Sequence, residues 1–166
     1  MDKKTAMIFL MVFVAAGTCL ADEIRGKVSS VDSSKKELQI SGVTIKAADA
    51  WIENEQDYPL ALENIVSGDY VEVDGKFTGL SEMKAQKIDR KQAESGAIKG
   101  KITAVDTKKR ELAIGGIVIK ITANAWLEGP GHVIIPIELF ACGYKVQCKG
   151  DWTGKSELTA FKVMVD

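Results

Sequence analysis

IRGKVSSVDSSKKELQISGVTIK, residues 24–46, returns as IKGKITAVDTKKRELAIGGIVIK at residues 98–120, without a gap and 74 positions later. The match then continues one residue out of step. SGDYVEVDGKFTGLSEMKAQKI at 67–88 aligns with CGYKVQCKGDWTGKSELTAFKV at 142–163, 75 positions later. Agreement over so much of the chain indicates an internal duplication. Each copy is about 67 residues long, which is near the lower size at which a domain folds alone.

Within each copy, apolar and polar residues alternate with the period of two that is typical of β-strands. Val71 and Val73, for example, flank the polar Glu72. Turn-forming residues separate these runs in the first copy at 32–35, 41–42, 67–69 and 78–79. The pattern predicts five short strands per copy, with residues 54–66 forming a short helix or loop between the third and fourth strands.

Five strands with an insertion after the third have the order of an OB-type barrel. Glycines recur at matching points inside the predicted strands, Gly26 with Gly100 and Gly75 with Gly150. They predict bulges or bends where a small barrel turns a corner. We therefore expect an all-β protein with two tandem, OB-like, five-stranded β-barrel domains. The expected boundaries are a signal peptide at 1–21, a first domain at 22–91, a linker at 92–97 and a second domain at 98–166.

The block GDYVEVDG, residues 68–75, with GKV before it and AQKI after it, resembles a bacterial exported domain of unknown function. That domain occurs in tandem behind signal sequences. The second copy, at 143–150, keeps the glycines and the central valine of the block but loses its acidic residues. The resemblance implies an extracytoplasmic β-barrel-like module without assigned chemistry. A more distant likeness to periplasmic bacterial OB-fold proteins is an analogy at the level of the fold.

The N-terminus has the composition of a signal peptide. Lys3 and Lys4 precede an apolar run at 6–16, and small residues follow at Cys19 and Ala21. The run is shorter than the roughly 20 apolar residues that a membrane-spanning helix needs. A retained N-terminal anchor is a minor alternative. We expect a periplasmic or secreted protein without a membrane span in the mature chain.

The mature chain has 20 basic and 22 acidic residues, which gives a net charge of −2. No basic stripe is present that could neutralise the phosphates of a nucleic acid. We therefore expect no nucleic-acid partner.

Two cysteines, Cys142 and Cys148, remain after the signal peptide. The five residues between them are predicted as strand, which would separate the two Cα atoms by roughly 20 Å at about 3.3 Å per residue. A disulfide spans no more than about 7 Å. We expect no bond between them. Cys148 aligns with Val73 and should be buried, whereas Cys142 aligns with Ser67 in a turn and could pair with another chain.

Catalytic and metal-binding arrangements are missing from the sequence. His132 is the single histidine and is expected to be an exposed loop residue. Carboxylates could attract calcium in the first copy, but most of their counterparts in the second are not acidic, which favours a solvated strand face. These carboxylates are Asp32, Asp69, Glu72 and Asp74. We predict no enzyme activity, no cofactor and no metal.

Aromatic residues are the best candidates for binding. Trp51 and Trp126 occupy equivalent positions, for which packing in the core or as a cap is predicted, with an aromatic stacking platform as the alternative. The candidate contacts to a ligand or partner are Tyr70, Phe77, Tyr144 and Trp152. The sequence predicts an exported, non-catalytic binding or interaction module of the bacterial cell envelope, with a small ligand or an envelope protein as its partner. The alternative is a structural or accessory subunit that packs against another exported protein.

Signal peptidase is expected to cleave between Ala21 and Asp22, because small residues occupy the positions that the enzyme recognises. N-terminal sequencing of the exported protein should begin at Asp22. A diacylated N-terminal Cys19 would contradict this and indicate a lipoprotein, although Thr18 departs from the residue that lipoproteins carry before that cysteine.

Overall fold

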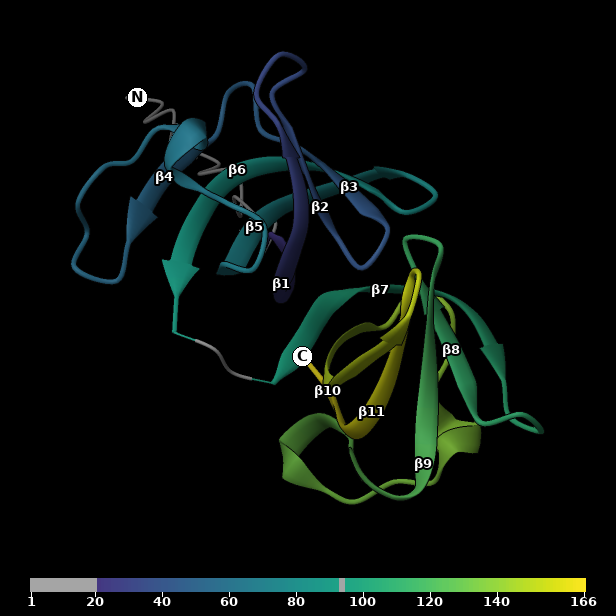
Figure 1. Cartoon of the computed structure of the whole chain (residues 1–166). Helices are drawn as coiled ribbons and strands as arrows, with labels where there is room; N and C mark the ends of the chain where they lie inside the picture. The colour runs from purple at the N-terminus through teal and green to yellow at the C-terminus, as the bar shows by residue number, and fades with distance from the viewer. Residues whose placement is uncertain (1–20, 93–94) are drawn as a thin grey trace, which may run out of the picture.

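The computed structural model describes residues 21–92 and 95–166. The predicted signal peptide and its alternative lipidation site, Cys19, therefore lie outside the described residues, apart from Ala21. The all-β prediction is confirmed, since the described chain contains eleven strands and three short 3-10 helices (Figure 1).

The first unit contains six strands and one 3-10 helix. They are β1 (Asp22–Asp32), β2 (Glu37–Ile40), β3 (Val43–Lys46), β4 (Trp51–Asn54), η1 (Leu62–Asn64), β5 (Tyr70–Gly79) and β6 (Glu82–Lys91). The second unit contains β7 (Gly96–Asp106), β8 (Glu111–Ile114), β9 (Ile117–Glu128), η2 (Pro130–His132), η3 (Ile137–Leu139), β10 (Lys145–Gly154) and β11 (Glu157–Val165). The short helix expected within 54–66 is η1.

The same pairing recurs in both units. In the first unit, β1 pairs antiparallel with β2 and β5, and β2 pairs antiparallel with β3. Strand β6 pairs antiparallel with β5 and parallel with both β3 and β4. In the second unit the long β9 takes the places of β3 and β4 and pairs parallel with β11.

The prediction of two tandem OB-like barrels is wrong. All eleven strands belong to one hydrogen-bonded sheet, and the strands form a β-solenoid of about 3 turns. The units join where β1 pairs with β7, because Ile24 lies opposite Val73 on one side and opposite Ile98 on the other. The repeat specifies which strands follow one another, but it does not specify which free edge a long strand such as β1 will pair with.

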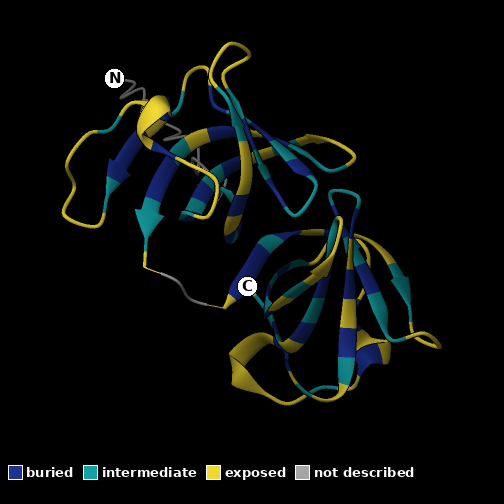
Figure 2. Cartoon of the chain, in the orientation of Figure 1, coloured by how far each residue is buried: buried dark blue, intermediate teal, exposed yellow. Residues whose placement is uncertain are grey.

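The core follows the alternation seen in the sequence. Val71 and Val73 are fully buried, whereas Glu72 between them is partly exposed. Blue and lighter segments accordingly alternate along the strands of both units (Figure 2). Side chains from both units make one continuous hydrophobic cluster, which includes Ile24 and Ile98 at the β1–β7 pairing.

The four matched glycines have two different roles. The predicted bulges occur at Gly75 and Gly150, where the register with the neighbouring strand shifts. A Cβ at these positions would lie 2.2 Å from Lys84 O and 2.1 Å from Thr159 O, so no side chain fits. Gly26 and Gly100 do not mark register shifts, so the prediction of a bulge is wrong for them.

Gly26 instead makes room for an aromatic side chain of the opposite unit, because a Cβ there would lie 2.6 Å from Trp152 Nε1. Gly115, in the turn after β8, does the same for Phe77, whose Cδ1 would lie 2.5 Å from a Cβ, whereas a Cβ at Gly100 would first meet Ile114 Cγ2 of its own unit at 2.6 Å. Trp152 Nε1 also donates a hydrogen bond of 2.8 Å to Arg25 O. Phe77 and Trp152 occupy equivalent positions in the repeat, so each unit inserts one aromatic ring into the other.

Backbone hydrogen bonds repeat this exchange. Ser81 N donates to Gly115 O at 2.6 Å, and the equivalent Ser156 N donates to Ser41 O at 2.5 Å. The junction therefore has the reciprocity of a two-fold symmetric dimer interface, built within a single chain.

Both cysteine predictions agree with the structure. Cys142 is exposed, Cys148 is buried on β10, and both thiols are free. Burial raises the pKa of Cys148 to about 12, so this thiol is unreactive at neutral pH.

Replacing Trp152 by alanine should lower the free energy of unfolding by about 3 kcal/mol, because the indole fills space at the junction between the units. Urea denaturation of the purified protein measures the change. Trp126→Ala is the matched control, since Trp126 is 51% exposed and its loss should cost less than about 1 kcal/mol. Equal losses in the two variants would contradict the role of Trp152 at the junction.

Candidate functional site

The four aromatic residues predicted as contacts lie in different environments. Tyr70 is buried, and its hydroxyl donates a hydrogen bond of 2.5 Å to Ser95 O. Phe77 and Trp152 lie at the junction between the units. Tyr144, in the turn before β10, is 45% exposed. Three of the four therefore have packing roles within the chain, and only Tyr144 presents a large exposed surface.

The predicted cleavage point lies at the beginning of β1. Ala21 O accepts a hydrogen bond of 3.1 Å from Lys145 Nζ. Asp22 is the first residue of β1, and its carboxylate accepts a hydrogen bond of 3.2 Å from Phe77 N. A mature chain that begins at Asp22 therefore retains all of β1.

Trp51 and Trp126 are the tryptophans that the structure places at the surface. Their exposed fractions are 56% and 51%. The prediction that they pack in the core is therefore wrong. The sequence signal for this was already present, because both residues immediately precede a buried residue, Ile52 or Leu127, and adjacent residues on a strand face opposite sides.

A buried carboxylate holds the Trp51 indole. Trp51 Nε1 donates a hydrogen bond of 2.6 Å to Glu53 Oε2. Lys87 Nζ lies 2.6 Å from Glu53 Oε1 and 3.1 Å from Asp89 Oδ1. The parallel pairing of β4 with β6 produces this cluster, because it places Trp51 opposite Lys87 and Glu53 opposite Asp89.

The ion pair changes the protonation of these groups. Lys87, and then the Trp51 indole N–H, lower the pKa of Glu53 to about 2. The two carboxylates raise the pKa of Lys87 in turn. Burial raises the pKa of Asp89. At neutral pH the lysine and Glu53 are therefore firmly charged, and the indole is fixed by an ionised acceptor.

The second unit repeats the cluster with different surroundings. Trp126 Nε1 donates a hydrogen bond of 3.0 Å to Glu128 Oε2, and Lys162 Nζ lies 3.7 Å from the same oxygen. His132 Nδ1 contacts the other oxygen of Glu128. His132 is the last residue of η2 and not part of a loop, but its side chain is 91% exposed, as predicted. The neighbouring His132 and Trp126 lower the pKa of Glu128.

Short hairpins hold both tryptophans in place. Glu53 makes an isolated bridge with Pro59, and Glu128 makes the equivalent bridge with Ile134. The side chains around the two tryptophans differ, since Val133, Ile134 and Phe161 are exposed in the second unit where the first has Tyr58, Pro59 and Gln86. The two sites therefore share a frame but offer different surfaces.

A shallow polar pocket of about 220 Å³ lies beside the first hairpin. It is lined by Asn54, Glu55, Gln56, Asp69, Arg90, Lys91 and Gln92. Ligand pockets are usually apolar and measure about 300 Å³ or more. The size and the polar lining both favour recognition at an open surface over enclosure of a small molecule.

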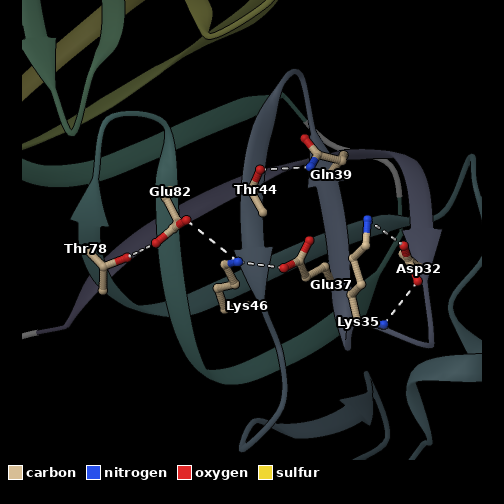
Figure 3. Close-up of polar contacts among 8 residues, drawn as sticks. All are labelled: Asp32, Lys35, Glu37, Gln39, Thr44, Lys46, Thr78 and Glu82. Carbon is tan, nitrogen blue, oxygen red and sulfur yellow. Dashed lines mark hydrogen bonds and ion pairs between the residues drawn. The ribbon is translucent and has the colours of Figure 1, made fainter.

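Three carboxylates meet on the outward side of the first unit. Ligand oxygens of Glu72, Asp74 and Asp89 lie within 4.8 Å of one another. The sequence grouped the first two with Asp69 and Asp32, which lie elsewhere. Asp69 accepts a hydrogen bond from Val66 N, and Asp32 holds the first turn through Lys35 (Figure 3).

Substituting Glu53 by glutamine should make the stability of the fold change less with pH in the acidic range. The lowered pKa means that Glu53 stabilises the fold above its ordinary pKa of 4.5, and that this contribution is lost as the pH falls toward 2. E53Q should therefore be less stable than the wild type at pH 7, with the difference shrinking between pH 4.5 and pH 2. Thermal unfolding followed by circular dichroism measures this. E63Q, on the exposed side of η1, is the control, and a difference that stays constant with pH would contradict the assignment.

No helix in the described part of the chain is long and apolar enough to cross a membrane. Neither the curated proteins nor the solved structures that were searched contain a match to the chain. Residues 25–89 match the family model described as a domain of unknown function, DUF5666. The matched residues run from β1 to β6, which makes the first unit a DUF5666 domain and confirms that the block at 68–75 lies in a domain of unknown function.

Proposed function

We propose that the protein is an exported, non-catalytic binding and interaction module of the bacterial cell envelope, and that Trp51 and Trp126 are its principal contacts with a partner. The observation that carries the proposal is the duplicated, half-exposed tryptophan fixed by a buried glutamate. Tryptophan is among the residues that contribute most at protein interfaces. Two such residues in equivalent places are best explained by recognition, because an exposed indole contributes little to packing.

The rigidity of the clusters supports binding. Each indole N–H is already satisfied by Glu53 or Glu128, so the ring is held in one orientation before a partner arrives. A preorganised side chain loses less conformational entropy on association. The carboxylates of these clusters are also engaged by Lys87 and Lys162, which suits a positioning role better than acid–base catalysis.

Export is supported by the sequence alone. The positive residues, the short apolar run and the small residues before Asp22 have the order of a signal peptide. The absence of a cysteine bridge within residues 21–92 and 95–166 does not oppose export, because aliphatic side chains fill the core of both units.

The alternative, an accessory subunit that packs against another exported protein, is favoured by one observation. The exposed Val133 and Ile134 lie next to the Trp126 cluster, and they extend its apolar surface in the second unit. Contiguous exposed apolar residues are typical of protein interaction sites. In this case Trp126 would dominate binding and Trp51 would contribute little.

Capture from a native envelope extract tests the proposal. The exported protein is immobilised, and retained components are quantified by mass spectrometry for the wild type and for W51A/W126A. We expect about a tenfold loss of specifically retained material in the double variant. V66A, which shortens a side chain that is 57% exposed, is the control and should bind normally.

The single variants separate the two functions. Similar losses in W51A and W126A support a binding module with two sites, whereas a loss confined to W126A and V133S/I134S supports the accessory subunit. Unchanged retention by the double variant would contradict both.

A further inference from the structure

The edges of the sheet are nearly all occupied by other strands. Among the described residues, every strand except β4 pairs with at least two others. The outer side of β4 is covered by residues 58–60 of the first hairpin, and the outer side of the last residues of β9 is covered by residues 133–135 of the second. These two hairpin segments are therefore the outer edges of the sheet.

Both segments pair with their strand in the same way. In each unit, two backbone hydrogen bonds of 2.8 and 3.0 Å flank one central residue, Pro59 or Ile134. The bonds run from Asn54 N to Tyr58 O and from Leu60 N to Ile52 O in the first unit, and from Gly129 N to Val133 O and from Ile135 N to Leu127 O in the second. A central residue in this pattern forms a non-hydrogen-bonded pair, so its own backbone groups point away from the strand. The backbone groups of Pro59 and Ile134 therefore decide whether each edge is open.

The two central residues differ in the property that strand pairing requires. Pro59 has no N–H, and a proline at an edge blocks the addition of a further strand. Ile134 has both an N–H and a C=O, and neither group takes part in a hydrogen bond within the described residues. The edge of the first unit is therefore closed, whereas the edge of the second unit is open.

The side chains beside Ile134 leave the open edge unprotected. Natural sheets shield their edges with charged side chains or prolines. Val133, Ile134 and Ile135 carry no charge, and the first two are 60% and 62% exposed. Adjacent residues on a strand face opposite sides, so apolar surface is exposed on both faces of this segment. The edge thus combines a free donor and a free acceptor with exposed apolar side chains.

We propose that this edge pairs with the same edge of a second copy of the chain, antiparallel and about a two-fold axis between the two Ile134 residues. Each Ile134 N–H donates to the Ile134 C=O of the other copy, so two hydrogen bonds satisfy all four free groups. Val133 lies opposite Ile135 of the other copy, and these cross-strand neighbours cover one another. The ladder ends there, because His132 has a left-handed backbone and Pro136 has no N–H.

A second copy fits this edge for three reasons. Ile134 offers one donor and one acceptor, so the edge is its own complement. The uncharged segment brings no like charges together when it pairs with itself. Because Pro59 closes the equivalent edge, each chain has one open edge, and assembly stops at two chains without forming a filament. The interface goes beyond the proposed function, since the backbone of Ile134 holds the partner here and the indoles hold it there.

Sedimentation equilibrium of the purified exported protein tests the proposal. Two hydrogen bonds and a small apolar contact give a weak dimer, so the series runs from about 10 µM to about 1 mM protein. We expect the mean mass to rise from one chain toward two. I134P should stay monomeric, because it removes both hydrogen bonds of the symmetric pair. The equivalent Pro59 shows that the hairpin accommodates proline, and circular dichroism checks the fold. I134A keeps the N–H, is the matched control and should dimerise about tenfold more tightly than I134P.

Opening the first edge makes the test specific. P59I supplies the missing N–H and gives each chain two open edges, so we expect assemblies larger than two chains at the highest concentration. P59I/I134P, with one open edge, should again stop at two. W51A changes a site of the proposed function but leaves this edge intact and should dimerise normally, so the two proposals fail separately. A wild type that is monomeric throughout, equal dimerisation of I134P and I134A, or a P59I variant that never exceeds two chains would overturn the proposal.

Discussion

The pairing of β1 with β7 is the contact on which the arrangement of the two units depends. Ile24 and Ile98 lie opposite each other there, fully buried, and each also pairs with the β-strand behind it, β5 or β10. A strand with partners on both sides cannot move without breaking two ladders. Phe77 and Trp152 cross the junction in opposite directions and fill the space left by glycines in the partner unit. The two copies therefore constrain each other, which explains why one core cluster includes residues of both.

The same scaffold then carries two surface sites. Period-two alternation along β4 and β9 brings a tryptophan and a glutamate to one face, and the adjacent parallel strand adds a lysine. The carboxylate is the central group, because it accepts from the indole and binds the ammonium at the same time. In the second unit His132 contacts the equivalent carboxylate, and the lysine lies farther away, at 3.7 Å. One frame can thus hold the indole while the groups around it change.

The duplication also allows equivalent positions of the two units to be compared. The residues that hold each unit together keep their character in both copies, whereas several outward positions on β5, β6 and β10 change from acidic to neutral or basic. Packing constrains inward residues strongly and outward residues weakly. Outward charges accordingly change in both directions between the copies: Asp74 corresponds to Lys149, whereas Lys76 corresponds to Asp151.

The sequence by itself determined the all-β class, the repeat, the strand alternation, the bulges at Gly75 and Gly150 and the different environments of Cys142 and Cys148. All of these depend on local backbone chemistry or on matching one copy with the other. Only the tertiary structure decided that one sheet joins the units in place of two separate barrels. It also decided that Phe77 and Trp152 pack across the junction while Trp51 and Trp126 are exposed. The reason is physical: alternation indicates which residues share a face, but an aromatic ring on that face can be buried against its own unit, against the other unit or against a partner. That choice depends on which edges and glycine-lined gaps the folded chain brings within reach.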